Sequence, residues 1–438
     1  MALNTRIGPT ALAAALGLVA LGSAGAAHAD DTLCSDVKTS VLASSPNTHF
    51  IFGSGGSAIT PTLAKVAYVL SQSADQPIFV FYQDGGGAAA GYASFVGQSG
   101  GKASNKFKYW KVATDVTGTT PTCVADDANA GGPVDFATTG GSLALFGLTA
   151  ADDVGTFRGP TQGINIIVPK AVTDPSSIST EALYFVYGFS DGSQYVDATS
   201  PVPWTDPAYI YKRDDNAFVQ QFLRGAISTL GGNAANFVGF GAATLSSPNT
   251  NQGSVDKVAA ATAAGHAQSA IGFTSGPTAD KNRAVVNTLA YQHTGQDTGY
   301  WPDSSPEAFD KINIRNGHYF LWDTNLFFTK LSSGSNAHAT LDQIANPDVK
   351  AFIGYFSGQV PSLDVTNAII TTGSIPQCAM QVSRASDFAG LSCYAPPTPC
   401  GHYYESTATG TLSGTQCETD ANCGGAEPKC HFNYCEAY

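Results

Sequence analysis

Short apolar segments rich in β-formers alternate with helical patterns from residue 31 to about residue 390, and this alternation constrains the fold more than any other feature. Residues 50–52 form a short strand that runs into the glycine-rich segment 53–57. Apolar residues then recur at i, i+3, i+4 and i+7 between Leu63 and Leu70, the spacing of one helical face. The pattern predicts an α/β protein.

The same alternation continues along the chain. Residues 77–82 are expected to form a buried strand before the glycines at 85–87. Further strands are expected at 164–168, 182–187, 209–211, 270–273, 285–290 and 319–322. A helix is expected after residue 216, with its apolar face made by Val219, Phe222, Leu223, Ala226, Ile227 and Leu230. A body of roughly 360 residues exceeds one ordinary core, so two lobes are expected.

The N-terminal segment 1–29 is typical of a signal peptide. Arg6 precedes an alanine-rich apolar run, and Ala27-His28-Ala29 supplies the small-x-small pattern of a cleavage site. No later stretch approaches about 20 uncharged apolar residues, so we expect no membrane insertion. The mature protein is therefore expected in the periplasm or secreted.

The charge balance is acidic, with 21 basic and 34 acidic residues and a net charge of −13. Removal of residues 1–29 takes away Arg6 and leaves 20 basic residues. An acidic chain with no basic cluster argues against nucleic acid and anionic membranes as partners. A small anionic ligand stays compatible with it, because a small site uses local donors.

Nine cysteines in an exported chain indicate disulfides. The candidates are Cys34, Cys123, Cys378, Cys393, Cys400, Cys417, Cys423, Cys430 and Cys435. The odd number leaves one thiol unpaired or intermolecular, and the pairing stays open at this point. Residues 396–399 indicate a linker, and the cysteine-rich module after it is too small to bury much of a core. We favour disulfides over zinc there and expect no metal and no cofactor.

Two features could bind an anion. Backbone N–H groups and hydroxyls in segment 53–57 precede a helix, and a helix N-terminus attracts anions. Arg213 begins the second strand-to-helix unit, and its planar fork fits carboxylate or phosphate oxygens. The plainer alternatives are a glycine-rich turn and a surface ion pair between Arg213 and a neighbouring acid. Segment 135–140 carries two hydroxyls and matters only if it lies beside Ser57.

Two matches to the esterase motif G-x-S-x-G place Ser99 and Ser190 as candidate nucleophiles. Neither serine lies between a buried strand and a periodic helix. In a chain with 47 glycines such matches arise by chance. We therefore predict a protein that is not an enzyme.

Segment 53–67 resembles the first loop and helix of periplasmic phosphate-binding proteins. The glycine spacing, Pro61 and Ala64-Lys65 match the opening of that family. Other segments follow in the family's order at 80–83, 134–136, 211–213 and 270–273. The resemblance covers most of residues 48–375, and cysteine-rich tails like 378–435 accompany some exported bacterial relatives.

The resemblance implies a type II periplasmic binding fold, in which two α/β lobes close on a ligand. The first lobe would comprise residues 31–165 and 320–395, and the second lobe residues 166–319. The tail module would be 396–438. An ABC-type permease is the partner that the resemblance implies.

The family's binding residues carry over incompletely. Its first-loop hydroxyl falls on Ser57 and its arginine on Arg213, which both keep their chemistry. Its second-loop serine falls on Gly87 and its aspartate on Gly140, while the Ser-Gly-Thr after the arginine falls on 217–219. Each lost donor to a dehydrated oxyanion costs about 1–3 kcal/mol, so a ligand other than phosphate, or none, stays open.

Our leading hypothesis is a solute-binding protein that captures a small phosphate-like anion or a polar metabolite. Ser57 and the adjoining helix would bind one side, and Arg213 would reach from the other lobe. Thr139 and the backbone N–H groups of Gly87, Gly140 and Asn216 would complete the site. The alternative is a degenerate scaffold that acts as a surface or matrix interaction protein. A hydrolase using Ser99 or Ser190 is the weakest hypothesis.

Overall fold

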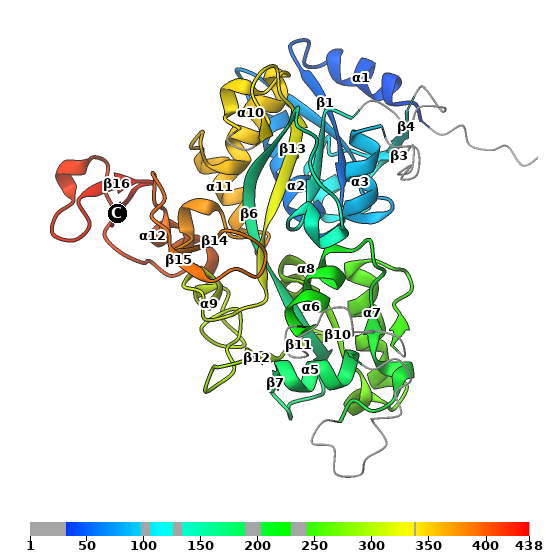
Figure 1. The fold of residues 1–438 in the computed structure, drawn as a ribbon. Helices are drawn as coiled ribbons and strands as arrows, with labels where there is room; N and C mark the ends of the chain where they lie inside the picture. The colour runs from blue at the N-terminus through cyan, green and yellow to red at the C-terminus, as the bar shows by residue number, and fades with distance from the viewer. Residues whose placement is uncertain are drawn as a thin grey trace, which may run out of the picture.

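The structure is a computed structural model of the 438-residue chain. It describes residues 32–97, 106–125, 134–188, 203–228, 243–336 and 339–437. Figure 1 shows two lobes, one above the other, with the C-terminal elements to one side of their junction. The segment expected to be a signal peptide, the two motif serines Ser99 and Ser190, and Leu230 lie outside the described residues.

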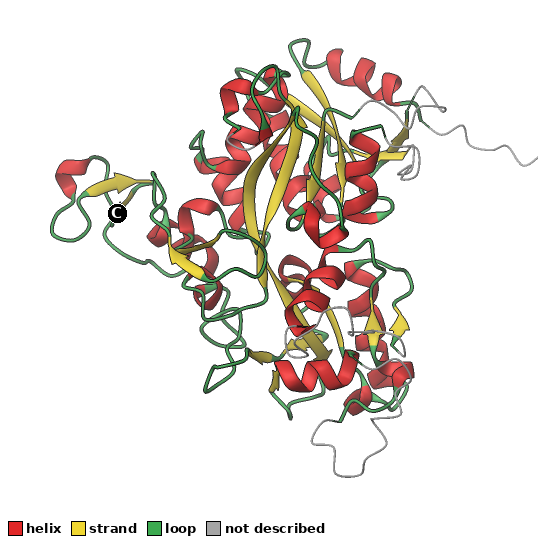
Figure 2. Cartoon of the chain, in the orientation of Figure 1, coloured by secondary structure: helices red, strands yellow, loops and turns green. Residues whose placement is uncertain are grey.

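The first lobe is built on a sheet whose central strands are parallel. Its strands are β1 (His49–Gly55), β2 (Ile78–Gln83), β3 (Lys106–Lys108), β4 (Thr122–Val124) and β5 (Phe136–Thr139). Strand β1 lies between β2 and β5 and is parallel to both. The helices are α1 (Cys34–Leu42), α2 (Thr60–Ser71), α3 (Gly87–Phe95), α4 (Ala113–Thr117), α10 (Pro347–Ser357) and α11 (Leu363–Ile370), with the 3-10 helices η1 (Leu143–Phe146) and η8 (Leu341–Gln343). Helices flank the sheet on either side (Figure 2).

Strand β6 (Val154–Pro169) connects the lobes because it is long enough to belong to both. Its first part pairs antiparallel with β13 (Trp322–Lys330), from Gly163 opposite Trp322 to Val154 opposite Lys330. Its last part pairs with strands of the second lobe. All of β6 from Gly159 onward is buried. The chain therefore leaves the first lobe on β6 and returns on β13.

The second lobe surrounds the end of β6. Its strands are β7 (Ser177–Ser179), β8 (Tyr211–Lys212), β9 (Thr244–Leu245), β10 (Gly272–Ser275), β11 (Val286–Thr288) and β12 (Ala290–Gln292). Its helices are α5 (Thr180–Tyr187), α6 (Phe218–Ser228), α7 (Asn251–Ala263) and α8 (Gly276–Lys281), with η3 (Pro207–Tyr209) and η6 (Ala267–Ser269). The buried face of α6 is the one expected from the sequence, and Phe222 and Leu223 are fully buried on it.

The C-terminal part packs beside the junction of the lobes. It contains η9 (Gln377–Ala379), β14 (Val382–Arg384), β15 (Leu391–Cys393), α12 (Gly401–Thr409), η10 (Asp420–Asn422), β16 (Lys429–His431) and β17 (Tyr434–Glu436). Helix α9 (Ile312–Arg315), which precedes β13 in the chain, contacts this part through Arg315, whose Nη1–H donates to Glu405 Oε1 at 2.9 Å. Cys400 and Tyr404 belong to the same buried apolar cluster as residues of the second lobe. The start of the tail is therefore docked on the body and not suspended from a free linker.

Four disulfides use eight of the nine cysteines. They join Cys34 to Cys123, Cys378 to Cys400, Cys417 to Cys430, and Cys423 to Cys435. Cys393, in β15, is exposed and unpaired, so it is the thiol that the odd count left over. The Cys378–Cys400 bond ties the tail to the body.

Three predicted strands need correction. Of residues 209–211, Tyr209 ends the 3-10 helix η3 and only Tyr211 lies in β8. Residues 182–187 belong to helix α5, which Ser179 caps by accepting a hydrogen bond from the Ala182 N–H at 3.1 Å. The run has strand-like composition, yet its buried positions Leu183, Val186 and Tyr187 have helical spacing. Residues 319–321 precede β13, which begins only at Trp322.

The two-lobed type II periplasmic binding fold with a disulfide-rich C-terminal module, expected from the sequence, is confirmed. Within the described ranges, no helix combines the length and apolar character needed to cross a bilayer.

Candidate functional site

A cavity of about 260 Å³ lies between the lobes. In the first lobe, the loops that line it follow the parallel strands β1, β2 and β5. In the second lobe, the lining segments follow β8 and β9, which are also parallel. The carboxyl ends of parallel strands meet at one edge of a sheet, and ligands of α/β proteins bind there. Two such edges face each other across this cavity.

Four helices begin at the wall of the cavity. The lining includes Ile59 before α2, Gly87 at the start of α3, Phe218 at the start of α6 and Asn251 at the start of α7. The first backbone N–H groups of a helix have no partner within it and carry partial positive charge. Four converging N-termini create a potential that favours an anion.

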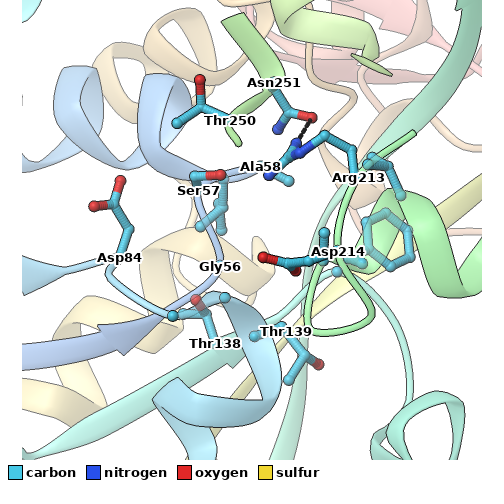
Figure 3. Close-up of a pocket in the computed structure, with 18 of the residues that line it drawn as sticks. Gly56, Ser57, Ala58, Asp84, Thr138, Thr139, Arg213, Asp214, Thr250 and Asn251 are labelled. Atoms are coloured by element: carbon cyan, nitrogen blue, oxygen red, sulfur yellow. Dashed lines mark hydrogen bonds between the residues drawn. The ribbon is translucent and has the colours of Figure 1, made fainter. Parts of the chain in front are cut away.

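Arg213 follows β8 and is only 4% exposed. Its Nε–H donates to Asn249 Oδ1 at 2.9 Å, one Nη1–H to Asn251 Oδ1 at 2.8 Å and one Nη2–H to the Asn249 carbonyl at 3.2 Å. Figure 3 shows Arg213 with its bond to Asn251, together with Ser57 and Ala58 from the first lobe. Burial lowers the pKa of Arg213 to about 10, and Asp214 partly opposes this. The side chain therefore stays a cation near neutral pH.

Three of the five N–H groups of Arg213 are used in these bonds. The other two have no acceptor among the described residues, and their side chain lines the cavity. A buried guanidinium held by neutral asparagines keeps most of its charge available to a ligand. Arg213 is thus the best placed anion-binding side chain of the described lining.

The remaining charges of the lining come from both lobes. Lys108 donates to Asp84 Oδ2 at 2.6 Å, and the Thr60 hydroxyl donates to the same oxygen at 2.9 Å. Asp214 accepts hydrogen bonds from the Asn216 N–H and from the Asn249 amide. Two cations and two carboxylates therefore border the cavity, and the Lys108–Asp84 pair neutralises itself.

Tyr82 forms hydrogen bonds that connect the loop after β1 to strand β5. Its hydroxyl donates to the Gly56 carbonyl at 3.0 Å and bonds the Thr138 hydroxyl at 2.7 Å. Burial raises the pKa of Tyr82 far above its usual value, so the phenol stays protonated and keeps this role at any physiological pH. The bond network fixes the loop after β1 against strand β5.

The lobes touch at the border of the cavity. The Ala88 N–H of α3 donates to the Asn216 carbonyl at 3.1 Å, across the lobe boundary. A Cβ at Gly87 would lie 2.5 Å from that carbonyl oxygen, and a Cβ at Gly140 would lie 2.2 Å from the ring of Phe218. Both glycines are therefore needed for the close approach of the second lobe.

Five of the six residues expected at the site line this cavity: Ser57, Gly87, Thr139, Gly140 and Arg213. Asn216 does not line it, and its backbone N–H already donates to Asp214 Oδ1 at 3.0 Å. The expectation of a free donor at Asn216 is therefore wrong. The Thr139 hydroxyl likewise donates to the Gly141 carbonyl, so it can offer a ligand only its lone pairs.

Several lining residues were not predicted from the sequence, namely Asp84, Lys108, Asn249, Thr250 and Asn251. Asp84 directly precedes the glycines of the second loop, and this position was a usable signal. The segment 249–251 gave a weaker signal, because its asparagines matter only once β9 pairs with β8 and brings them to Arg213.

No protein-family model and no curated protein matches the chain. Solved structures similar to it include an ABC-type phosphate transport receptor from Vibrio cholerae, at 17% identity and a TM-score of 0.40, over 75% of this chain and 99% of that one. A high-affinity periplasmic phosphate-binding protein bound with phosphate is 13% identical, with a TM-score of 0.44, over 75% of this chain and 90% of that one. The phosphate-binding protein from Stenotrophomonas maltophilia is 11% identical, with a TM-score of 0.37, over 75% of this chain and 90% of that one.

Proposed function

We propose that this chain is an exported solute-binding protein that captures a small anion between its two lobes. The observation that carries the proposal is the interlobe cavity, where four helix N-termini meet a buried arginine with two unused N–H groups. Both features favour a negative ligand, and neither is needed to fill a core. The described lining contains no cysteine, and its two carboxylates, Asp84 and Asp214, already accept hydrogen bonds from neighbouring groups.

Capture would require the lobes to move apart and close again on β6 and β13. The Ala88–Asn216 hydrogen bond supports the idea that this structure represents the closed arrangement. We keep residues 31–165 with 320–395, and 166–319, as the proposed lobes, and 396–438 as the tail module. Hinge closure around a ligand is a common motion of two-lobed proteins.

An exported location is supported by the four disulfides, which persist in oxidising compartments. A permease of the ABC type is proposed as the partner, as the resemblance in the sequence implies. No observation on the described residues favours the scaffold alternative.

Isothermal titration of the mature chain with phosphate, sulfate and small carboxylates tests the proposal. At least one anion should bind, and Arg213→Ala should weaken its binding roughly 10- to 100-fold, because a charged hydrogen bond contributes about 1.5–3 kcal/mol. Arg224→Ala is the matched control, since Arg224 lies on α6 and does not line the cavity. Absence of binding to the whole panel, or equal effects of the two variants, would reject the proposal.

A further inference from the structure

The cavity is larger than an inorganic oxyanion requires. Its volume is about 260 Å³. A single water needs only about 10–15 Å³ of such space. An oxyanion of five heavy atoms would therefore leave most of the cavity to water. A ligand with additional atoms would fill it.

The charges of the lining suit one negative charge and not two. Lys108 is paired with Asp84 at 2.6 Å, so this pair adds no net charge. Asp214 lies close enough to Arg213 to oppose the lowering of its pKa. The net charge of the four side chains is zero, and only the partial charges of the helix N-termini remain in excess. A dianion would meet two carboxylates with too little compensation.

One part of the lining is apolar. Phe218 is 3% exposed and its ring covers Gly140 and Gly141, whose added Cβ atoms would lie 2.2 and 3.1 Å from it. Ala58 from the first lobe belongs to the same buried apolar cluster as Ala217 and Phe218. The apolar lining residues are Ala58, Ile59, Ala88, Ala217, Phe218 and Val219. These side chains offer no hydrogen bonds to an oxyanion and would pack against carbon atoms.

From these three observations we infer that the ligand is a monoanionic organic acid, with one carboxylate-type head toward Arg213 and a compact apolar body against Phe218. This inference rests on the proposed function, because it concerns the same cavity. The head accepts the two remaining N–H groups of Arg213, which suit two oxygens of a planar group. The body takes the space that water would otherwise occupy, and excluding that water stabilises the closed lobes.

Titration of the mature chain with acetate, butyrate, pentanoate, benzoate and inorganic phosphate tests this assignment. Each methylene that enters the apolar part should tighten binding about fourfold, the equivalent of about 0.8 kcal/mol. Benzoate should bind more tightly than acetate by at least tenfold, and phosphate more weakly than benzoate. Equal or tighter binding of phosphate would overturn the inference and leave the proposed function standing. Absence of binding for all five probes would overturn the inference, and absence of binding for sulfate as well would also reject the proposed function.

Two leucine variants test whether the apolar body of the ligand packs against Phe218. Phe218→Leu should weaken the binding of benzoate several-fold more than the binding of acetate. Phe222→Leu is the matched control, because Phe222 is fully buried one turn further along α6 and does not line the cavity. Circular dichroism should first show that both variants are folded. An equal loss for acetate and benzoate in Phe218→Leu, or the same benzoate effect in Phe222→Leu, would contradict the assignment.

Discussion

Gly87 offers a direct test of whether the lobes close as the structure shows. Its φ is +84°, and an added Cβ would lie 2.5 Å from the Asn216 carbonyl oxygen of the opposite lobe. Ordinary contacts begin at 3.4 Å, so the two segments would have to separate by about 0.9 Å. Gly147 is the matched control, because its φ is +67° and nothing lies within 4 Å of its added Cβ.

The two alanine variants share one cost and differ in another. Each places a side chain in the left-handed region, which costs roughly 1–2 kcal/mol of folding free energy. Only Gly87→Ala also forces the Ala88 N–H away from the Asn216 carbonyl, a hydrogen bond of about 0.5–1.5 kcal/mol. That loss falls on the closed arrangement alone, so it shifts the balance toward open lobes about 2- to 13-fold.

Thermal unfolding, small-angle scattering and titration with benzoate measure these effects. Both variants should unfold at a lower temperature than the parent chain. Only Gly87→Ala should increase the radius of gyration without ligand and weaken ligand binding by the factor above. Identical scattering curves and affinities for the two variants would show that this contact does not govern closure.

Three further predictions follow from groups outside the cavity. Burial and the neighbouring Asp387 raise the pKa of Asp323 well above its usual range, so the folded state holds a proton that the unfolded state releases above about pH 3.9. The free energy of unfolding should therefore fall as pH rises from about 3.9 through the raised pKa, by about 1.36 kcal/mol for each pH unit over which only the folded state stays protonated. Asp323→Asn should flatten this profile in urea titrations. Loss of the Cys34–Cys123 bond through paired serine substitutions should lower stability by roughly 2–5 kcal/mol, because it closes a segment with a sequence separation of 89. Lys311→Met should cost about 3–5 kcal/mol, because the fully buried ammonium bonds Asp280 and Asp303 at 2.8 Å and its removal leaves two carboxylates with the single charge of Arg283.

Each of these predictions has a result that would contradict it. An Asp323→Asn profile with the slope of the parent chain would show that another group takes up the proton. If calorimetry shows that the variant without the Cys34–Cys123 bond is as stable as the parent chain, this disulfide does not contribute to stability as predicted. A Lys311→Met variant as stable as the parent would mean that Arg283, which already bonds Asp280 at 2.6 Å and Asp303 at 2.7 Å, compensates both carboxylates without Lys311.

Local pattern was sufficient for the elements whose signal lies within a few residues. The apolar run of β2 and the periodic faces of α2 and α6 were predicted from their spacing. Helix α5 shows where the local signal failed. Its aromatic and β-branched composition favours a strand, and the Ser179 cap together with packing against the core of the second lobe decides for a helix.

The candidate site divides in the same way. Ser57 and Arg213 were identifiable, because each follows a short strand and precedes a helix. The positive end of a helix can be located from the local sequence alone, without knowing which segments pack beside it. The partners of Arg213 were not identifiable. Asn249 and Asn251 reach it only because β9 pairs with β8, and a pairing between distant segments depends on the whole core.

The sequence by itself determined the class of fold, several of the strands and helices, and the presence of an odd cysteine, since these depend on spacing and counting. Only the tertiary structure decided which cysteine stays free, how the tail docks, and what Gly87 and Gly140 do. Those two glycines looked like ligand donors, and the structure shows that a side chain on either of them would collide with the second lobe. The reason is physical: a glycine's role depends on what occupies the space where its side chain would be, and that occupant lies about 130 residues away for Gly87 and about 80 for Gly140.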